Sequence, residues 1–187
     1  RAVQTHTNDY YHHRIAELGL SEDEARHQYG FTPSDNGDII LAAFHYNGQP
    51  IEFIPESRRK AFKKLTARKT TGEAHEGSYY RQYGRVRVHP DRLKPGGAKY
   101  YSVAGENVPP FPMPAARKAY QQGLTGGAVC FIEGEFKAAA LDKNGIETVA
   151  FGGIGLYKLD HTTRDDIDTR RPDVILVAYD GDLNDVR

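Results

Sequence analysis

Three carboxylates stand directly after two apolar runs in the C-terminal part of this chain. Glu133 follows the run 128–132, and Asp180 and Asp182 follow the run 173–179. If both runs are neighbouring strands of a parallel sheet, their carboxyl ends meet at one edge and bring the three side chains together. Carboxylates packed at one point repel one another unless a cation neutralises them, and the hard cations Mg²⁺ and Mn²⁺ prefer oxygen ligands. We therefore predict a divalent-metal site formed by Glu133, Asp180 and Asp182.

The segments around these carboxylates alternate between strand and helix. The pattern predicts strands at 128–132, 146–151 and 173–179, and helices at 135–143 and 160–171. Strands that alternate with helices form right-handed crossovers and a parallel sheet, whose ligands bind beyond the carboxyl ends of the strands. Both groups of carboxylates stand at such ends.

The N-terminal half has a mixed pattern of helices and antiparallel strands. A first helix is expected over residues 8–19, and Ser21 and Glu24 have the spacing of a capping box for a second helix that ends at Gly30. A hairpin turn is expected at Asn47-Gly48. The strands predicted in this half are 38–46, 50–54, 79–88 and 99–103.

Two segments are expected to lack regular structure. Residues 56–78 are polar and aperiodic, which indicates a mobile loop, and the proline-rich run 108–114 indicates an extended linker before a helix at 115–122. We therefore predict an N-terminal α+β nucleic-acid-binding module over 1–122, followed by an α/β domain over 123–187.

The charge is unevenly distributed, although the formal net charge of the chain is zero. Between Ser57 and Lys99 there are thirteen Lys and Arg residues against three acids, and between Phe131 and Arg187 there are seven against twelve. A basic segment followed by an acidic one is typical of a protein that binds a polyanion and metal ions. The residues predicted to bind nucleic acid are Arg58, Arg59, Lys60, Lys63, Lys64, Arg81, Arg85, Arg87, Lys99 and, from the helix at 135–143, Lys137. The alternative interpretation is a solvated loop beside an ordinary amphipathic strand.

The composition excludes several kinds of site and location. The single cysteine, Cys130, excludes an intrachain disulfide and a multi-cysteine zinc site, and the scattered histidines form no zinc-binding pattern. The apolar runs fall short of the roughly 18 residues that a membrane span requires, and no signal peptide is recognisable. We therefore expect a cytoplasmic protein with no membrane partner. Because the sequence begins at Arg1 without a methionine, we also expect it to be a fragment of a longer chain.

The two carboxylate motifs resemble the Toprim domain of bacterial-type primases, topoisomerases and small nucleases. Phe131-Ile132-Glu133-Gly134 is similar to the family's strand that ends in Glu-Gly, and Tyr179-Asp180-Gly181-Asp182 to its strand that ends in Asp-x-Asp. The wider pattern resembles a Toprim-like family of phage, plasmid and mobile-element replication proteins. In the N-terminal half this similarity rests on the opening Gly19–Ala25 and on an Arg-rich strand with a Lys-Tyr pair, here Arg85, Arg87, Lys99 and Tyr100.

The resemblance implies a Toprim fold for 123–187, with a parallel Rossmann-like sheet that is incomplete at its C-terminus. The usual glycine after Asp-x-Asp is replaced by Leu183. The resemblance also implies that Asp180 and Asp182 hold Mg²⁺ or Mn²⁺, and that Glu133 is a general acid/base or a further metal ligand.

The function implied by the resemblance is nucleotidyl transfer, as a DNA primase or a primase-associated protein in phage or mobile-element replication. Its expected partners are single-stranded DNA or RNA, nucleoside triphosphates and a helicase. Two alternatives remain open. One is a Toprim nuclease that cleaves phosphodiesters with the same carboxylates, and the other is a non-catalytic module that binds single-stranded nucleic acid.

Three further features near the carboxylates each allow two interpretations. Glu135 either supports the metal site or is the acid favoured in the first turn of a helix. Lys137 either meets a phosphate or the carboxylates, or it is solvated. The glycine-rich run 152–155 either approaches a phosphate or forms a tight exit from the strand.

Overall fold

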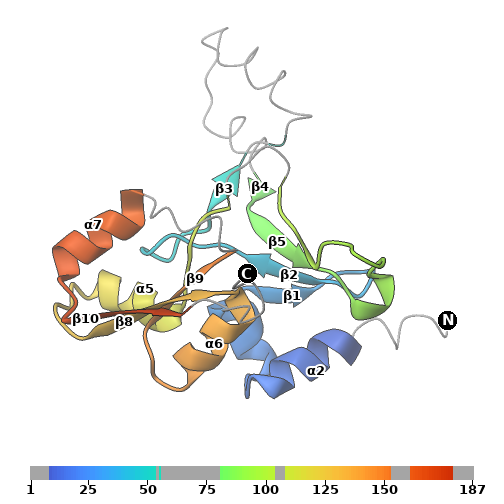
Figure 1. The fold of residues 1–187 in the computed structure, drawn as a ribbon, viewed down its shortest axis with the longest axis horizontal. Coiled ribbons are helices and arrows are strands. Elements are labelled where there is room, and N and C mark those ends of the chain that lie inside the picture. The colour runs from blue at the N-terminus through green and yellow to red at the C-terminus, as the bar shows by residue number, and fades with distance from the viewer. Residues whose placement is uncertain (1–8, 54, 56–80, 104–107, 153–160, 179–187) are drawn as a thin grey trace, which may run out of the picture.

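The computed structural model describes residues 9–53, 55, 81–103, 108–152 and 161–178. They form two four-stranded sheets and a two-stranded ribbon, with helices packed around them (Figure 1). One sheet is antiparallel and the other is mostly parallel, which confirms the predicted mixed α/β content. The loop expected at 56–78 lies outside the described residues.

Two short helical segments open the described chain and confirm the prediction for residues 8–30. Helix α2 spans Asp9–Glu17 and buries Tyr11. The capping box is present, because the Glu24 backbone N–H donates to Ser21 Oγ at 3.2 Å and the Ser21 N–H donates to the Glu24 carboxylate at 2.8 Å. A π-helical turn, η1, follows at Glu24–Gln28. Local capping chemistry therefore sets where this second helix begins.

The antiparallel sheet has the strand order β1-β2-β5-β6. Its strands are β1 (Phe31–Pro33), β2 (Ile39–Ala42), β5 (Gly84–Arg87) and β6 (Tyr100–Tyr101). Strand β1 was not predicted. The predicted turn at Asn47-Gly48 is confirmed, with Gly48 at φ +84°.

The predicted strands 38–46 and 79–88 are wrong in their length. The backbone of Ile51 accepts from the Tyr83 N–H at 2.6 Å and donates to the Ala43 carbonyl at 3.0 Å. Through these bonds the segment around Ile51 takes the place of β2 as the pairing partner of the chain near Tyr83. Each of the two long predicted strands is therefore interrupted. The remainder forms a separate ribbon, in which β3 (Glu52–Phe53) pairs with β4 (Arg81–Gln82).

The second sheet contains the predicted strand–helix–strand unit. Strands β8 (Ala128–Glu133), β9 (Thr148–Phe151) and β10 (Val174–Ala178) are parallel, with β8 between the other two. Helix α6 (Glu135–Lys143) has the predicted bounds and connects β8 to β9. Helix α7 (His161–Arg170) precedes β10. The carboxyl ends of the three strands therefore lie at one edge of the sheet, as expected.

The proline-rich segment expected to be a linker is instead part of this sheet. Phe111–Pro112 forms β7, which pairs antiparallel with β9, and helix α5 (Pro114–Gln121) follows it. The interpretation as a linker was wrong because Phe111 and Met113 are buried, at 3 % exposure each. Proline is compatible with this position because β7 is an edge strand and does not need to donate on its outer side.

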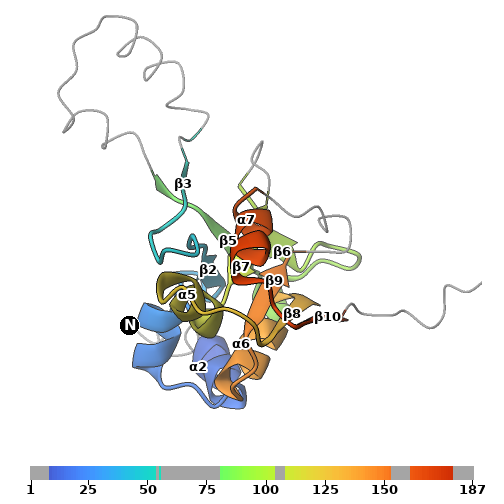
Figure 2. The same cartoon turned by 90° about the vertical axis from the view of Figure 1, so that its left-hand side faces the viewer.

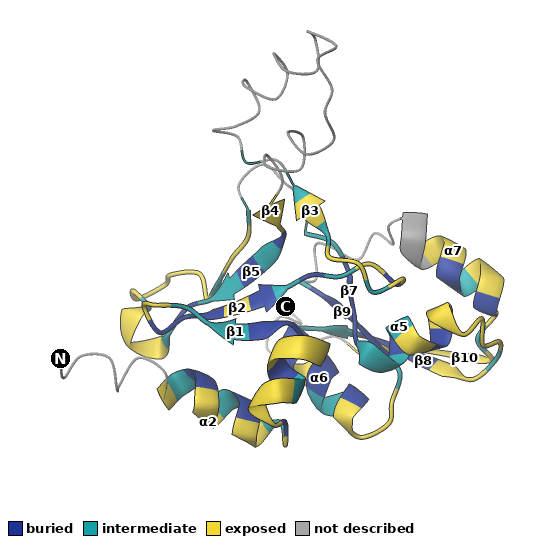
Figure 3. Cartoon of the chain, turned by 180° about the vertical axis from the view of Figure 1, so that it is seen from behind, coloured by how far each residue is buried: buried dark blue, intermediate teal, exposed yellow. Residues whose placement is uncertain are grey.

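One apolar core extends across the predicted boundary between residues 122 and 123. The rings of Phe31 on β1 and Phe136 on α6 are 5.1 Å apart, centroid to centroid. The Tyr29 hydroxyl donates to Asp142 Oδ2 at 2.8 Å, and Lys143 Nζ lies 2.6 Å from Glu24 Oε1. Figure 2 shows α2 beside α6, and Figure 3 shows the buried residues concentrated in the strands and on the inner faces of these helices. The two sheets thus share a core.

Strand β10 is the exposed edge of the mostly parallel sheet. All five of its residues are exposed, although Val174, Ile175, Leu176 and Val177 are apolar. Among the helices of the described part of the chain, none combines the length and apolarity needed to cross a membrane.

Candidate functional site

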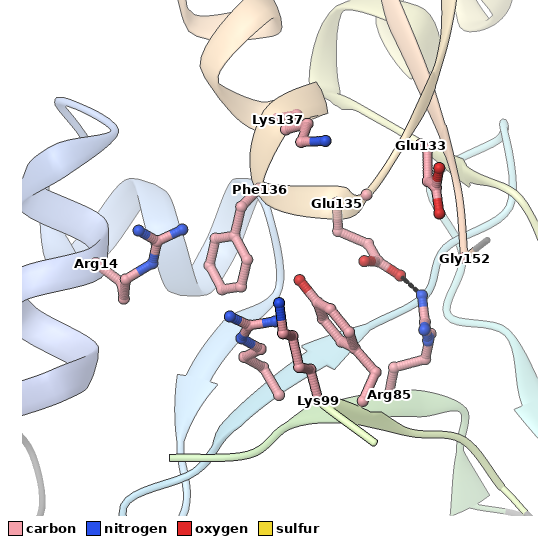
Figure 4. Close-up of a pocket in the computed structure, with 11 residues that line it drawn as sticks. Arg14, Arg85, Lys99, Glu133, Glu135, Phe136, Lys137 and Gly152 are labelled. Carbon is pink, nitrogen blue, oxygen red and sulfur yellow. Dashed lines mark hydrogen bonds and ion pairs between the residues drawn. The ribbon is translucent and has the colours of Figure 1, made fainter. Parts of the chain in front are cut away.

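A pocket of about 410 Å³ lies where α2, the antiparallel sheet and the start of α6 meet (Figure 4). Its charged lining consists of five cations and two carboxylates. The cations are Arg14, Arg85, Arg87, Lys99 and Lys137, and the carboxylates are Glu133 and Glu135. Five of these seven residues were predicted as site residues: Arg85, Arg87, Lys99, Lys137 and Glu133. They come from segments that are up to about fifty positions apart in the sequence.

Glu133 is the last residue of β8 and lies on the wall of the pocket. Gly134, at φ +95°, turns the chain directly from β8 into α6, and its N–H donates to the Phe151 carbonyl at 3.0 Å. Only glycine adopts this φ without strain, so the tight turn explains the Glu-Gly pair. Glu133 Oε2 is buried and has no hydrogen-bond partner among the described residues. A buried carboxylate oxygen without a partner is suited to binding a cation.

Strand β10 ends at the same edge of the sheet as β8, and the other two predicted ligands follow it in the sequence. Ala178, the last residue of β10, is paired in the parallel register with Ile132, the residue directly before Glu133. In the sequence, Asp180 comes two positions after Ala178. Asp180 and Asp182 themselves lie outside the described residues. Within the residues that the structure does describe, no three His, Cys, Asp or Glu side chains gather in a way that could hold a metal ion.

Arg85 and Glu135 form a buried ion pair at the base of the pocket (Figure 4). The side chain of Glu135 is fully buried and that of Arg85 is 7 % exposed. Burial raises the pKa of the Glu135 carboxyl, and the adjacent Arg85 guanidinium opposes this shift. Arg85 was predicted to bind nucleic acid, but its guanidinium is held by a carboxylate of the chain itself.

Gly152 provides the space for this ion pair. A Cβ at residue 152 would lie 2.6 Å from Arg85 Nη1 and 2.7 Å from Val108 Cγ1. This glycine therefore allows the Arg85 guanidinium to pack against the backbone at the end of β9. Residues 153–155 of the glycine-rich run lie outside the described part of the chain.

Tyr100 connects two of the pocket's arginines. The guanidinium carbons of Arg85 and Arg87 lie 4.6 Å and 4.7 Å from the centroid of its ring. Arg87 is paired with Tyr100 across β5 and β6, and Arg85 is two residues away on the same face of β5. The Arg87 Nε also donates to the Tyr10 hydroxyl at 3.2 Å. Burial is the main reason that the pKa of Tyr100 is raised, so its phenol stays neutral.

Arg14 is the cation that sequence reasoning missed. It comes from α2, where it forms an ion pair with Glu17, and its guanidinium lies 5.0 Å from the centroid of the Phe136 ring. Its Nε is buried and has no hydrogen-bond partner among the described residues. A single arginine on a short amphipathic helix gives no local signal of a site, because only the tertiary packing of α2 against α6 places it there.

The other predicted nucleic-acid-binding residues are not in the pocket as described. Arg81 is exposed on β4 and does not line it. The remaining five lie outside the described residues: Arg58, Arg59, Lys60, Lys63 and Lys64.

Comparison with known proteins does not assign this chain to a family. Neither protein-family models, nor curated proteins, nor solved structures gave a match. The functional assignment therefore depends on the site itself.

Proposed function

We propose that this chain carries the Toprim-like part of a metal-dependent enzyme that transfers nucleotidyl groups on nucleic acid, of the DNA primase type. The observation that carries the proposal is the position of Glu133. It ends β8 in a pocket lined by five cations, beside the parallel strand β10 that leads into Asp180-Gly181-Asp182. Carboxylates next to cations are what a reaction on phosphates with a divalent metal requires.

The arrangement of strands supports the Toprim resemblance without depending on it. The order β10-β8-β9 and the direct turn from Glu133 into α6 agree with a strand ending in Glu-Gly beside a strand ending in Asp-x-Asp. Ligands of parallel sheets bind at the carboxyl ends of the strands, which is where Glu133 lies.

In this proposal Glu133, Asp180 and Asp182 would hold Mg²⁺ or Mn²⁺. The buried Glu133 Oε2, which lacks a partner among the described residues, fits that role. When bound, the metal would neutralise negative charge on the reacting phosphate. The chain's own cations in the pocket, Arg87 and Lys99 among them, would bind and orient the phosphate groups.

The test is incubation of the 187-residue chain with labelled single-stranded DNA, nucleoside triphosphates and Mg²⁺ or Mn²⁺. We expect new products built from the triphosphates, and a decrease of roughly a hundredfold or more in Glu133→Gln. Glu52→Gln is the matched control, because Glu52 is an exposed carboxylate on β3. Shortened DNA would instead indicate that the protein is a nuclease that uses the same carboxylates. Intact DNA without synthesis would instead support the non-catalytic binding module.

A further inference from the structure

Building on the proposed function for the class of partner, we propose that a second pocket holds an unpaired base of a nucleic-acid strand. This pocket lies on the opposite face of the antiparallel sheet from the pocket that contains Glu133, and its volume is about 350 Å³. We call it the outer pocket. Its lining includes Thr32, Ile40, Ala42, Phe44, Gln82 and Gly84. The site would hold the strand away from the reacting phosphate.

The two pockets use opposite faces of one sheet. Side chains alternate along a strand, so on β5 Arg85 lines the pocket with Glu133 while the neighbouring Gly84 lines the outer pocket. The register pairs Gly84 with Ala42 of β2, which therefore lies on the same outer face. Six strand residues point to this face, and none of them is buried: Thr32, Ile40, Ala42, Gly84, Val86 and Tyr101. The face is therefore open to a ligand.

Small residues form the floor of the outer pocket. Ala42 and Gly84 face each other across β2 and β5. A Cβ on Gly84 would lie 3.3 Å from Ile40 Cγ2, so this glycine keeps the depression between the strands open. Glycine inside a strand weakens it and often marks a place where a ligand approaches the backbone closely. A flat, mostly apolar floor of this kind suits a planar ring.

Phe44 forms a fixed wall of the outer pocket. A Cβ on Gly30, which has φ +72°, would lie 2.6 Å from Phe44 Cε2, so the ring packs directly on the backbone there. The Arg117 guanidinium carbon lies 4.7 Å from the centroid of the Phe44 ring. A ring held in this way can contact a base with little loss of side-chain freedom.

The charges in the lining favour a neutral group over a phosphate. Arg26 lies 2.8 Å from the Glu22 carboxylate, and His27 Nδ1 lies 2.9 Å from Asp23 Oδ1. Both basic residues of the lining are therefore next to a carboxylate. The pocket thus lacks the excess of positive charge that a phosphate requires.

The remaining polar groups and a nearby ring match a base. Thr32 contributes a hydroxyl and Gln82 an amide to the lining, and both are neutral groups that can donate and accept. An unpaired base has a flat apolar face for stacking and a polar edge for hydrogen bonds. Tyr101, which points to the same face, is 58 % exposed and offers a ring to a neighbouring base.

The charge beside the outer pocket favours nucleic acid over a peptide. The ribbon of β3 and β4 rises from the antiparallel sheet (Figure 1), and its exposed Arg81 directly precedes Gln82. The segment 56–80, which joins β3 to β4 in the sequence, contains seven Lys and Arg residues against three acids. This excess of positive charge complements the phosphates on either side of a bound base.

A tryptophan reporter tests the proposal, because the chain itself contains no tryptophan. Ile40→Trp places an indole in the outer pocket, where a base that stacks against it should quench its fluorescence. We expect quenching by oligothymidylate, in EDTA and without triphosphates, and little quenching by an abasic strand of the same length. Leu124→Trp is the matched control, because Leu124 is 50 % exposed and does not line the outer pocket.

Fluorescence anisotropy with labelled strands measures the affinity of two further variants. Ala42→Leu fills the floor and should weaken binding of oligothymidylate by roughly fivefold to a hundredfold. Gln82→Ala removes the amide and should weaken it by roughly twofold to tenfold. Gln122→Ala is the matched control, since Gln122 is an exposed glutamine at the end of α5 that does not line the outer pocket. Gln82 is also exposed, so its variant is expected to fold even if Ala42→Leu does not.

Three outcomes would overturn the proposal. One is an affinity for oligothymidylate that is unchanged in both variants. Another is an unaltered chain that binds the abasic strand as tightly as oligothymidylate, because no base would then contribute. The third is a neutral tyrosine-containing peptide that quenches Ile40→Trp at a lower concentration than oligothymidylate does, because the partner would then be a protein.

The design separates this proposal from the proposed function. In EDTA, Glu133→Gln is expected to bind oligothymidylate as tightly as the unaltered chain, since Glu133 does not line the outer pocket. If strand binding depends on Ala42 and Gln82 but no synthesis occurs with Mg²⁺, only the proposed function fails. Synthesis that depends on Glu133, with strand binding that is unchanged in Ala42→Leu and Gln82→Ala, would overturn the outer pocket alone.

Discussion

The Arg85 guanidinium and the Glu135 carboxylate form a buried ion pair. It connects β5 of the antiparallel sheet to the start of α6, the helix that follows β8 of the mostly parallel sheet. Taking two charges out of water is costly, so each depends on the other for neutralisation. Arg85 Nε and Glu135 Oε2 have no further hydrogen-bond partner among the described residues. The pair therefore orients the base of the pocket more than it stabilises the chain.

Removal of either partner alone is expected to be strongly destabilising. Arg85→Leu leaves a buried carboxylate and Glu135→Leu leaves a buried guanidinium, so each should lower the free energy of unfolding by about 3–5 kcal/mol. The double variant should recover much of that loss, because no unpaired charge remains. Urea denaturation of the four proteins measures this coupling. Single and double variants that lose stability additively would show that the two side chains do not depend on each other.

Gly152 is expected to be sensitive to the smallest side chain. Gly152→Ala places a Cβ 2.6 Å from Arg85 Nη1 and 2.7 Å from Val108 Cγ1, so both must move. We expect a loss of about 1–3 kcal/mol in the free energy of unfolding, typical of overpacking. The same substitution in an Arg85→Ala background should cost less, since one of the two clashes is gone. An equal loss in both backgrounds would assign the effect to Val108 and leave Arg85 uninvolved.

A buried acid on α7 gives the chain a specific pH dependence. Burial raises the pKa of Asp166 from 3.8 to about 6, with Glu147 adding to the shift and Arg170 opposing it. Between these values the folded chain binds a proton that the unfolded chain has released, so this group makes stability fall as pH rises from about 4 to about 6. Asp166→Asn cannot ionise and should remove that decrease. Thermal melts of both proteins across the same pH range measure it, and identical pH profiles would contradict the shift.

The features that sequence reasoning predicted correctly are those set by local chemistry. The capping box of Ser21 and Glu24 needs only residues three positions apart, and α6 is bounded by Gly134 and Asn144, one at each end. The alternation of strand and helix also specified the parallel strands, because crossover topology leaves few arrangements. Local signals therefore placed Glu133 correctly at a strand end.

The features that it missed depend on contacts between distant segments. Phe111–Pro112 contains a proline, which indicates a linker, yet pairing with β9 and burial make it a strand. Arg85 and Glu135 are fifty residues apart, and no spacing rule relates them. Arg14 reaches the pocket only because α2 packs beside α6. The metal site remains a prediction from motifs. Four of the pocket's cations were also predicted from the sequence, whereas the fifth, Arg14, and the Arg85–Glu135 pair required the tertiary structure.

The prediction for the metal concerns the two aspartates after β10. Asp180→Asn with Asp182→Asn removes two of the three proposed oxygen ligands and should reduce Mn²⁺ binding by at least roughly a hundredfold. Binding of single-stranded DNA should be unchanged, because neither residue belongs to the cationic wall of the pocket. Calorimetric titration with Mn²⁺, together with a DNA-binding assay on the same preparation, checks both expectations. Asp168→Asn is the matched control, since Asp168 is an exposed carboxylate on α7 that does not line the pocket. Full Mn²⁺ affinity in the double variant would remove Asp180 and Asp182 from the site, and Glu133 would then have no predicted partner there.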